Sequence, residues 1–306
     1  MNKIILSSII TLFTLGLNAQ DVETLISKYT QENGKKFLMP MADCIGANFN
    51  SGLFHSAMIK KMGFQMYIGI ATTTAFIPEK RKTFMAVPEG FFEPKTPVKV
   101  PTIFGMSENV IVNGVGGTQY VFPGGLNMKY LPLAMPQLTI GSVYGTDLTV
   151  RFFTYNFDDE DIGKLNLLGF GLRHSISQYF QNMPVDLAAG AYWQQFAIGD
   201  IVSASNLLFN VQTSYRVSIF TFYGALGYEK SLLDIDYTYT DTEGDTNVKF
   251  NMQGSNSVRF TGGLTFNLGP VKLIADYNLA SQSVLSLGLG IGIGDNINNK
   301  QQTPEQ

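Results

Sequence analysis

The chain has 306 residues, of which 15% are charged and 12% aromatic, with 31 glycines and a net charge of −3. Ordinary soluble domains carry about 25% charged residues, so the composition leans toward a protein that faces lipid with part of its surface. The small negative net charge gives no reason to expect nucleic acid as a partner. The single cysteine, Cys44, excludes an internal disulfide.

The first residues have the layout of an export signal. A charged start at Lys3 precedes the apolar run from Ile4 to Leu17, and Ala19 offers a small residue at a cleavage site. The run is shorter than the roughly 20 apolar residues of a spanning helix, and no later stretch reaches that length. We therefore interpret residues 1–19 as a cleaved signal peptide and exclude a helical membrane protein.

The segment 20–62 is predicted to hold a short helix and a plug. Val22, Leu25, Ile26 and Tyr29 recur at helical spacing. From Gly34 to Gly52 the sequence is rich in Gly, Asn and Met and predicts irregular chain. This stretch is expected to fold into the lumen of a barrel or to seal one end.

Prolines cluster between Pro78 and Pro136, a density that is rare in long central strands. Residues 78–100 are therefore predicted to form a long loop. Residues 110–131 are expected to form one hairpin that turns near Gly114 to Gly117.

From Ala134 onward, apolar residues alternate with polar or small ones, as strands of a membrane barrel require. The last strand shows this best, because Leu287, Leu289 and Ile291 alternate with Gly288 and Gly290. The pattern falters between Leu165 and Tyr179, where we expect either a bulge or an extension of the strand toward a loop. Residues 63–294 are thus assigned to an all-β, transmembrane antiparallel β-barrel.

The connections after Ala134 alternate between tight and long, as in outer-membrane barrels with short periplasmic turns and longer external loops. The tight set includes Gly145-Thr146, Ser218 and Gly269-Pro270; the long set includes the acidic run 158–161. With both termini periplasmic, nine strands fit into residues 134–294 and three to five before them. We predict 12–14 strands, favouring 14, followed by a polar, disordered tail over residues 295–306.

Several segments resemble an uncharacterised family of outer-membrane barrels that is similar in layout to the FadL-type long-chain fatty-acid transporters. They are the signal end Ala19-Gln20, the run from Gly46 to Ala57, and the blocks Gly169 to His174 and Met183 to Gly190. The resemblance implies 14 strands, an N-terminal hatch in the lumen and a hydrophobic ligand path with a lateral opening. This chain is shorter than those transporters and lacks their terminal aromatic residue.

Groups for covalent chemistry are scarce. Only His55 and His174 can act as bases near neutral pH, and His174 shares the outward parity of Phe170 and Leu172, away from the neighbouring serines. Two separated histidines and Cys44 do not make a metal site, and Gly114 to Gly117 lacks the context of a phosphate loop. We expect no enzyme activity, no metal and no cofactor.

Charged residues on inward positions form the one candidate site. A narrow lumen should pair such charges across the wall, and the arginines can also bind an anionic head group through forked hydrogen bonds. The residues from Met62 to Phe76 offer an apolar lining for such a ligand. The candidate lumen-facing residues are Arg151, Arg173, Arg216, Arg259, Lys272, Asp186, Glu229 and Asp276.

The leading hypothesis is a passive outer-membrane channel or transporter for small hydrophobic or amphipathic molecules such as fatty acids. The alternative is a non-transporting barrel that acts as a surface scaffold or as a partner of secretion or assembly machinery. A plugged lumen in which the charges are paired would favour the alternative. An outer-membrane hydrolase is disfavoured because it lacks a base. In both leading hypotheses the partners are outer-membrane lipid and the barrel-assembly machinery.

Overall fold

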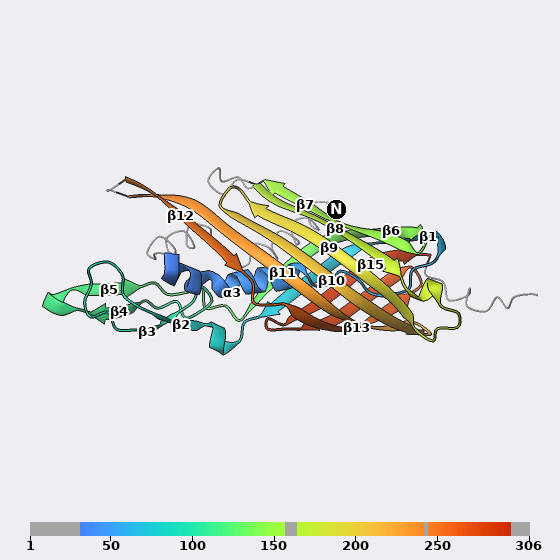
Figure 1. Ribbon diagram of the computed structural model, residues 1–306, viewed down its shortest axis with the longest axis horizontal. Helices are drawn as coiled ribbons and strands as arrows, with labels where there is room; N and C mark the ends of the chain where they lie inside the picture. The colour runs from blue at the N-terminus through green and yellow to red at the C-terminus, as the bar shows by residue number, and fades with distance from the viewer. Residues whose placement is uncertain (1–30, 157–163, 242–243, 295–306) are drawn as a thin grey trace, which may run out of the picture.

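The computed structural model describes residues 31–156, 164–241 and 244–294, and within them an antiparallel barrel closed by ten strands (Figure 1). Neighbouring strands pair in the order β10-β9-β8-β7-β6-β1-β15-β14-β13-β11, and β11 closes the circle on β10. The strands are β1 (Met62–Phe76), β6 (Tyr130–Val143), β7 (Thr146–Asn156), β8 (Lys164–Ser175), β9 (Asp186–Ile198), β10 (Val202–Val217), β11 (Phe220–Asp241), β13 (Val258–Leu268), β14 (Val271–Leu279) and β15 (Val284–Ile293). We call these ten strands the wall.

The predicted β-barrel is confirmed, but the strand number is lower than the predicted 12–14. Nine of the wall strands lie between Tyr130 and Ile293, as the alternation predicted, but only β1 precedes them. The proline-rich stretch adds no further wall strand among the described residues. The additional strand β12 (Gly244–Gln253) pairs with the far part of β11, beyond the point where β13 leaves it.

The wall has two faces of opposite character. Leu287 is 54% exposed on the outside, whereas Arg259 is 1% exposed on the inside. Because an exposed apolar belt has no favourable contact with water, the outer face is the lipid-facing surface of a transmembrane barrel. Exposed members of the belt include Ile68, Leu148, Phe170, Leu207, Phe209, Phe222, Leu226, Phe260, Leu273, Leu289 and Ile291.

Of the two alternatives expected between Leu165 and Tyr179, a bulge or an extension toward a loop, the structure excludes the bulge within β8. Its register is continuous with β7 and β9 on either side. The alternation faltered because Leu165 and Leu167 are apolar although they point inward, where they join the buried apolar core. The sequence pattern could not separate an inward leucine from a lipid-facing one.

The two ends of the barrel differ in their connections. At one end, here the turn end, tight connections follow β6, β10 and β13, and residues 176–185, which include η3 (Ser177–Tyr179), connect β8 to β9. Strand β1 begins and β15 ends at the same end. At the opposite end, here the loop end, the connections include residues 77–129, which form two small hairpins beyond the wall (Figure 1). The predicted alternation of tight and long connections therefore holds only in part, because residues 176–185 at the turn end form a longer connection than residues 199–201 at the loop end.

Residues 77–129, here the cap, lie over the loop end of the barrel. The predicted hairpin turn is confirmed, because β4 and β5 are joined through Gly114 to Thr118. The predicted loop 78–100 contains part of a second hairpin. The elements of the cap are η1 (Glu79–Arg81), β2 (Thr83–Ala86), β3 (Val98–Pro101), β4 (Val110–Asn113), η2 (Val115–Gly117) and β5 (Gln119–Phe122).

A 19-residue helix, α3 (Gln31–Phe49), runs from the loop end into the barrel (Figure 1). This corrects the irregular chain predicted for residues 34–52. Nearly every side chain from Met41 to Phe49 is buried, so α3 lacks the one-sided apolar stripe that marks a surface helix. Helix α3 begins with Gln31 at the loop end, whereas the sequence analysis placed the N-terminal side of the chain at the turn end, in the periplasm. None of the described helices is long and apolar enough to cross a membrane.

Helix α3 and the following segment 50–61, together called the plug, share a core with the wall and the cap. Phe37, Phe49, Ile103 and Phe250 are fully buried in this core, and the Ile103 amide donates to the Phe37 carbonyl at 3.0 Å. Four of the sequence predictions lie outside the described residues: the signal peptide, the helix around Val22, the acidic run 158–161 and the polar tail.

Candidate functional site

The candidate site is the place where the wall holds the end of the plug. Three inward-pointing arginines, Arg151 on β7, Arg173 on β8 and Arg259 on β13, reach the plug between Ala47 and Ser56. We call them the anchor arginines. All three are at most 5% exposed, so their N–H groups depend on acceptors inside the protein. The Nε of Arg259 is the one guanidinium nitrogen of the three for which the structure shows no acceptor.

Arg151 makes the most extensive contacts. Its guanidinium donates to the carbonyls of Phe49 at 3.0 Å, Ser51 at 2.9 Å and Gly52 at 2.8 Å. Its remaining contacts are with Gln137 on β6, Gln194 on β9 and the Met135 sulfur. A guanidinium carries five N–H donors, and these acceptors take up all of them.

Arg259 joins the plug to an acidic residue of the wall. It donates to the carbonyls of Asn50 at 2.8 Å and Ala47 at 3.0 Å, and to the Ser51 hydroxyl at 2.6 Å. Glu229, on the neighbouring strand β11, lies 2.8 Å away in a buried ion pair. The ion pair compensates the charge, while the carbonyls satisfy the donors that point toward the plug.

Arg173 repeats this arrangement closer to the turn end. Its Nε and one terminal nitrogen form a two-pronged pair with the Asp147 carboxylate, from the adjacent strand β7. Its other terminal nitrogen donates to the Ser56 carbonyl at 2.6 Å. The forked geometry is the strong form of an arginine–carboxylate contact, so the plug is held at two levels of the lumen.

The end of helix α3 explains why arginines serve here. The last carbonyls of a helix lack intrahelical partners and carry the negative end of its dipole. Arg259 and Arg151 supply donors to the carbonyls of Ala47 and Phe49, and the Gln194 amide adds a further bond to Phe49 at 2.6 Å. The wall therefore caps a helix to which the sequence assigns no basic residue in its last turn.

The structure separates the other predicted lumen residues into two groups. Glu229, Lys272 and Asp276 are buried on inward positions, like the anchor arginines. Lys272 donates to the Asn267 side chain at 3.0 Å, and Asp276 accepts from Tyr223 at 3.0 Å. Arg216 and Asp186 are only half-buried and lie at the turn end of β10 and β9, away from the helix.

Asp147 is the site residue that the sequence reasoning missed. It directly follows the predicted tight turn at Gly145-Thr146 and precedes Leu148, where the predicted alternation of this strand begins. Its parity along β7 matches that of Thr149 and Arg151, and it is 6% exposed. The alternation alone was sufficient to place Asp147 in the lumen.

The expected apolar lining from Met62 to Phe76 is corrected. Met62, Phe64 and Ile68 lie on the lipid-facing side of β1, whereas Tyr67 and Ala71 are the buried, inward residues. The methionines near the plug come from other segments: Met41 of α3, Met135 of β6 and Met252 of β12. The proposed lining residues were on the wrong face because β1 starts its alternation with an outward Met62.

The two histidines lie apart and in different surroundings. His174 lies on an outward position of β8, as its parity predicted, and it is close to the turn end of the strand. Its side chain bonds to Thr146, Gln178 and Tyr179 at 2.8–2.9 Å. His55 is buried in the plug, with its ring 4.5 Å from that of Tyr67. Among the residues that the structure describes, no cluster of His, Cys, Asp and Glu has the makings of a metal site.

Residues 1–293 match one protein family over nearly the whole chain, the family of unknown function DUF6588. The chain belongs to this family. A search of the curated proteins found no match for this DUF6588 chain.

Solved structures similar to the DUF6588 chain are outer-membrane barrels of low sequence identity. The outer membrane protease OmpT from Escherichia coli is 7% identical over 77% of this chain and 96% of that chain, with a TM-score of 0.34. The toluene transporter TbuX of Ralstonia pickettii is 8% identical over 78% and 91%, with a TM-score of 0.20. The attachment invasion locus protein Ail of Yersinia pestis is 12% identical over 75% and 95%, with a TM-score of 0.18. At these values the likeness says nothing about function.

Proposed function

We propose that this chain is a closed barrel of the bacterial outer membrane that works as a surface scaffold, acting through its cap rather than as an open channel. The lipid-facing belt and the position of the longest connection, residues 77–129, at one end of the barrel support a location in the outer membrane. In this proposal the chain performs no covalent chemistry. Its partners are membrane lipid, the assembly machinery that inserts it and a ligand of the cap.

The hold of the anchor arginines on the plug carries this proposal. Arg151 and Arg259 together bind the carbonyls of Ala47, Phe49, Asn50, Ser51 and Gly52. Hydrogen bonds to charged groups contribute about 1.5–3 kcal/mol each, so releasing these five carbonyls would cost on the order of 10 kcal/mol. Passive diffusion of a solute does not supply such an energy.

The cap supports the second half of the proposal. Ile111 and Val121 form a cross-strand pair on the outer face of the β4–β5 hairpin, and both are exposed. Phe91 is fully exposed, and the ring of the next residue, Phe92, lies 5.5 Å from that of Tyr120 on β5. Apolar side chains gathered on an exposed surface are typical of interaction sites. The plug is joined to the start of the cap by the ion pair between Asp43 of α3 and Arg81 of η1.

A permeability measurement tests the closed state. Liposomes containing the full chain should swell in small neutral solutes no faster than empty liposomes, whereas liposomes with a general porin should swell rapidly. The double variant Arg151→Ala/Arg259→Ala should leak more than the wild type if the anchors hold the plug. Rapid swelling with the wild-type chain would overturn the proposal and favour a channel.

A transporter for hydrophobic or amphipathic molecules, similar in layout to the FadL-type proteins, is the second candidate. The observation that favours it is the buried core shared by α3, the wall and β12, which contains Met41, Met135 and Met252. Methionine adapts its shape to varied neighbours, so a helix packed on methionines can give way to a ligand. Uptake of a labelled long-chain fatty acid into proteoliposomes tests this candidate. Uptake equal to that of protein-free liposomes would exclude it.

A further inference from the structure

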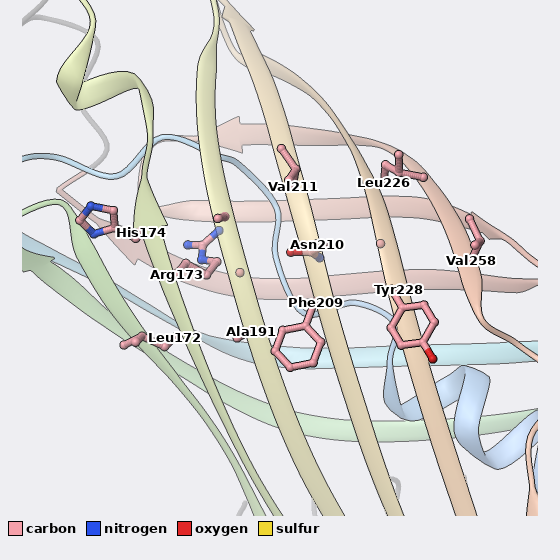
Figure 2. A pocket seen from close by; sticks show the side chains of 13 residues that line it. Leu172, Arg173, His174, Ala191, Phe209, Asn210, Val211, Leu226, Tyr228 and Val258 are labelled. Atoms are coloured by element: carbon pink, nitrogen blue, oxygen red, sulfur yellow. The ribbon is translucent and has the colours of Figure 1, made fainter.

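A groove crosses the lipid-facing side of the wall on strands β8, β9, β10, β11 and β13, with a volume of about 610 Å³ (Figure 2). Two alanines of β9, Ala189 and Ala191, form its floor. Ala191 lies in register between Leu172 and Phe209 of the neighbouring strands, as Figure 2 shows. Because small side chains stand between large ones in one outward row, the wall is hollowed at this point.

The walls of the groove are apolar and belong to the belt that contacts lipid. Phe209 and Tyr228 are paired across β10 and β11, and Val211 and Leu226 form the next outward pair. All four side chains are more than half exposed. In a membrane this surface contacts hydrocarbon, not water. An acyl chain that lies in the groove therefore makes van der Waals contacts with both its floor and its sides, which a flat surface does not offer.

One end of the groove is polar. His174 lines it at the turn end, in register with Ala189. The His174 ring contacts the Thr146 hydroxyl, the Tyr179 hydroxyl and the Gln178 amide. Exposed Tyr144 and Phe180 lie close by in the turn-end connections. Aromatic side chains of this kind gather where the hydrocarbon meets the lipid head groups.

We propose that this groove is a binding site for a single phospholipid of the turn-side leaflet. One acyl chain lies over Ala189 and Ala191, and the head group lies at His174 and Gln178. An amphipathic occupant is required because the groove is apolar along its length and polar at one end. The site lies on the outer surface of the wall, so it does not depend on whether the lumen conducts.

The single tryptophan gives a direct readout. Trp193 is the next outward residue of β9 after Ala191, and it is the only tryptophan in the chain. The full chain in detergent is titrated with a phospholipid that carries brominated acyl chains, which quench tryptophan on contact. Quenching of Trp193 should saturate at about one lipid per protein. Quenching that rises without saturation, in proportion to the lipid in the micelle, would overturn the proposal.

Matched variants locate the lipid. Ala191→Phe fills the groove and should weaken binding about tenfold, corresponding to about 1.4 kcal/mol. Leu289→Phe, an equal ring on the belt at β15, should leave binding unchanged. Equal binding by the Ala191→Phe and wild-type chains would contradict the proposal. Retained heat-modifiable migration on gels shows that both variants are folded.

The polar end and a competing occupant are tested separately. His174→Ala should weaken binding of the brominated phospholipid about fivefold and leave binding of a brominated diacylglycerol, which lacks the phosphate head group, unchanged. Equal losses for both would contradict the assignment of the head group. If the wild type sediments as a dimer, Ala191→Phe as a monomer, and neither shows saturable quenching, the groove is an interface between copies and the lipid proposal is wrong.

Discussion

Arg151 is the residue on which the attachment of the plug depends most. Replacing it by methionine keeps much of the packing of its stem but leaves the Ser51 and Gly52 carbonyls and two glutamine side chains without this donor. The Phe49 carbonyl keeps its bond from the Gln194 amide. Each buried polar group that loses its partner costs about 1–3 kcal/mol. We expect Arg151→Met to lower the free energy of unfolding by about 3 kcal/mol or more, measured by urea unfolding in lipid vesicles.

Arg216 supplies the matched control for this prediction. It shares the inward parity of the anchor arginines but is half-buried, and its Nε donates to the Ser218 carbonyl at 3.3 Å near the turn. Arg216→Met should change the free energy of unfolding by less than about 1 kcal/mol. Equal losses in the two variants would mean that the plug carbonyls contribute no special stability.

Cys44 is a residue whose chemistry follows from its burial. It lies fully buried in α3, and desolvation raises the pKa of its thiol, with a further rise from the nearby Asp43 carboxylate and an opposing effect of Arg81. Since the thiolate is the form that reacts, a raised pKa lowers the reactive fraction at every pH below it. We expect iodoacetamide at pH 8 to leave Cys44 unmodified in the folded chain.

The check for Cys44 is mass spectrometry of the alkylated chain with and without denaturant. Alkylation should become complete only in the unfolded chain. Between pH 7 and pH 9 the folded chain should show no rise of the kind that an ordinary thiol gives. Modification of the folded chain at the rate of a free cysteine would contradict both the burial and the raised pKa.

The sequence predicted which charged residues face the lumen but not what they bind. Alternation along a strand is enough to place Arg151 and Arg259 inside, because parity is a local property. Their acceptors are carbonyls of the plug about 100 and 209 residues away in the chain. A backbone carbonyl has no sequence signature, so the anchoring could not be read from residue types. From the sequence, the inward arginines could therefore be interpreted in two ways: as partners of other lumen charges or as a binding site for an anionic head group.

At the scale of elements, the fit of α3 against β11 depends on a glycine. A Cβ added at Gly46 would lie 2.4 Å from the Ser231 side chain. Gly46→Ala gains about 1 kcal/mol of helix propensity but overpacks a closed contact, which costs about 1–3 kcal/mol. We expect a net loss of stability in urea unfolding.

A double variant and a control variant test the origin of this loss. Ser231→Gly removes the side chain that an alanine at position 46 would meet, so the double variant Gly46→Ala/Ser231→Gly should be more stable than Gly46→Ala alone. Gly262→Ala on β13, where nothing lies within 4 Å of the added carbon, should show no overpacking loss. Absence of coupling between positions 46 and 231 would mean that α3 does not pack on β11 this closely.

Helix α3 shows why the periodicity of apolar residues does not predict a helix that is buried on all sides. A helix is recognised when one face is apolar and the other polar, and Pro40 within it further argues against a helix. Inside a barrel the helix is surrounded, so small, polar and apolar residues occur on every side. The wall strands have lipid on one face and the lumen on the other, so apolar and polar or small residues alternate along them. This alternation predicted most of the wall strands.

At the scale of the whole molecule, ten strands surround one helix, α3, among the residues that the structure describes. The prediction of 14 strands followed partly from a resemblance and partly from the assumption that residues between Leu53 and Leu131 cross the membrane repeatedly. Instead, that region supplies β1 and the cap. Its prolines are compatible with short hairpins at the loop end, where one strand edge can remain unpaired.

The orientation of the molecule leads to the last prediction. If the turn end faces the periplasm, as in outer-membrane barrels, then Ile111 of the cap is on the cell surface and Tyr144 of the turn end is inside. Both side chains are more than half exposed, and Cys44 is buried, so cysteines introduced at these positions report without interference. In intact cells a membrane-impermeant maleimide should label Ile111→Cys and not Tyr144→Cys, and both should be labelled after lysis. The reverse pattern would place the cap in the periplasm and remove it as a cell-surface scaffold, whereas equal labelling in intact cells would mean that no sealed membrane separates the two ends.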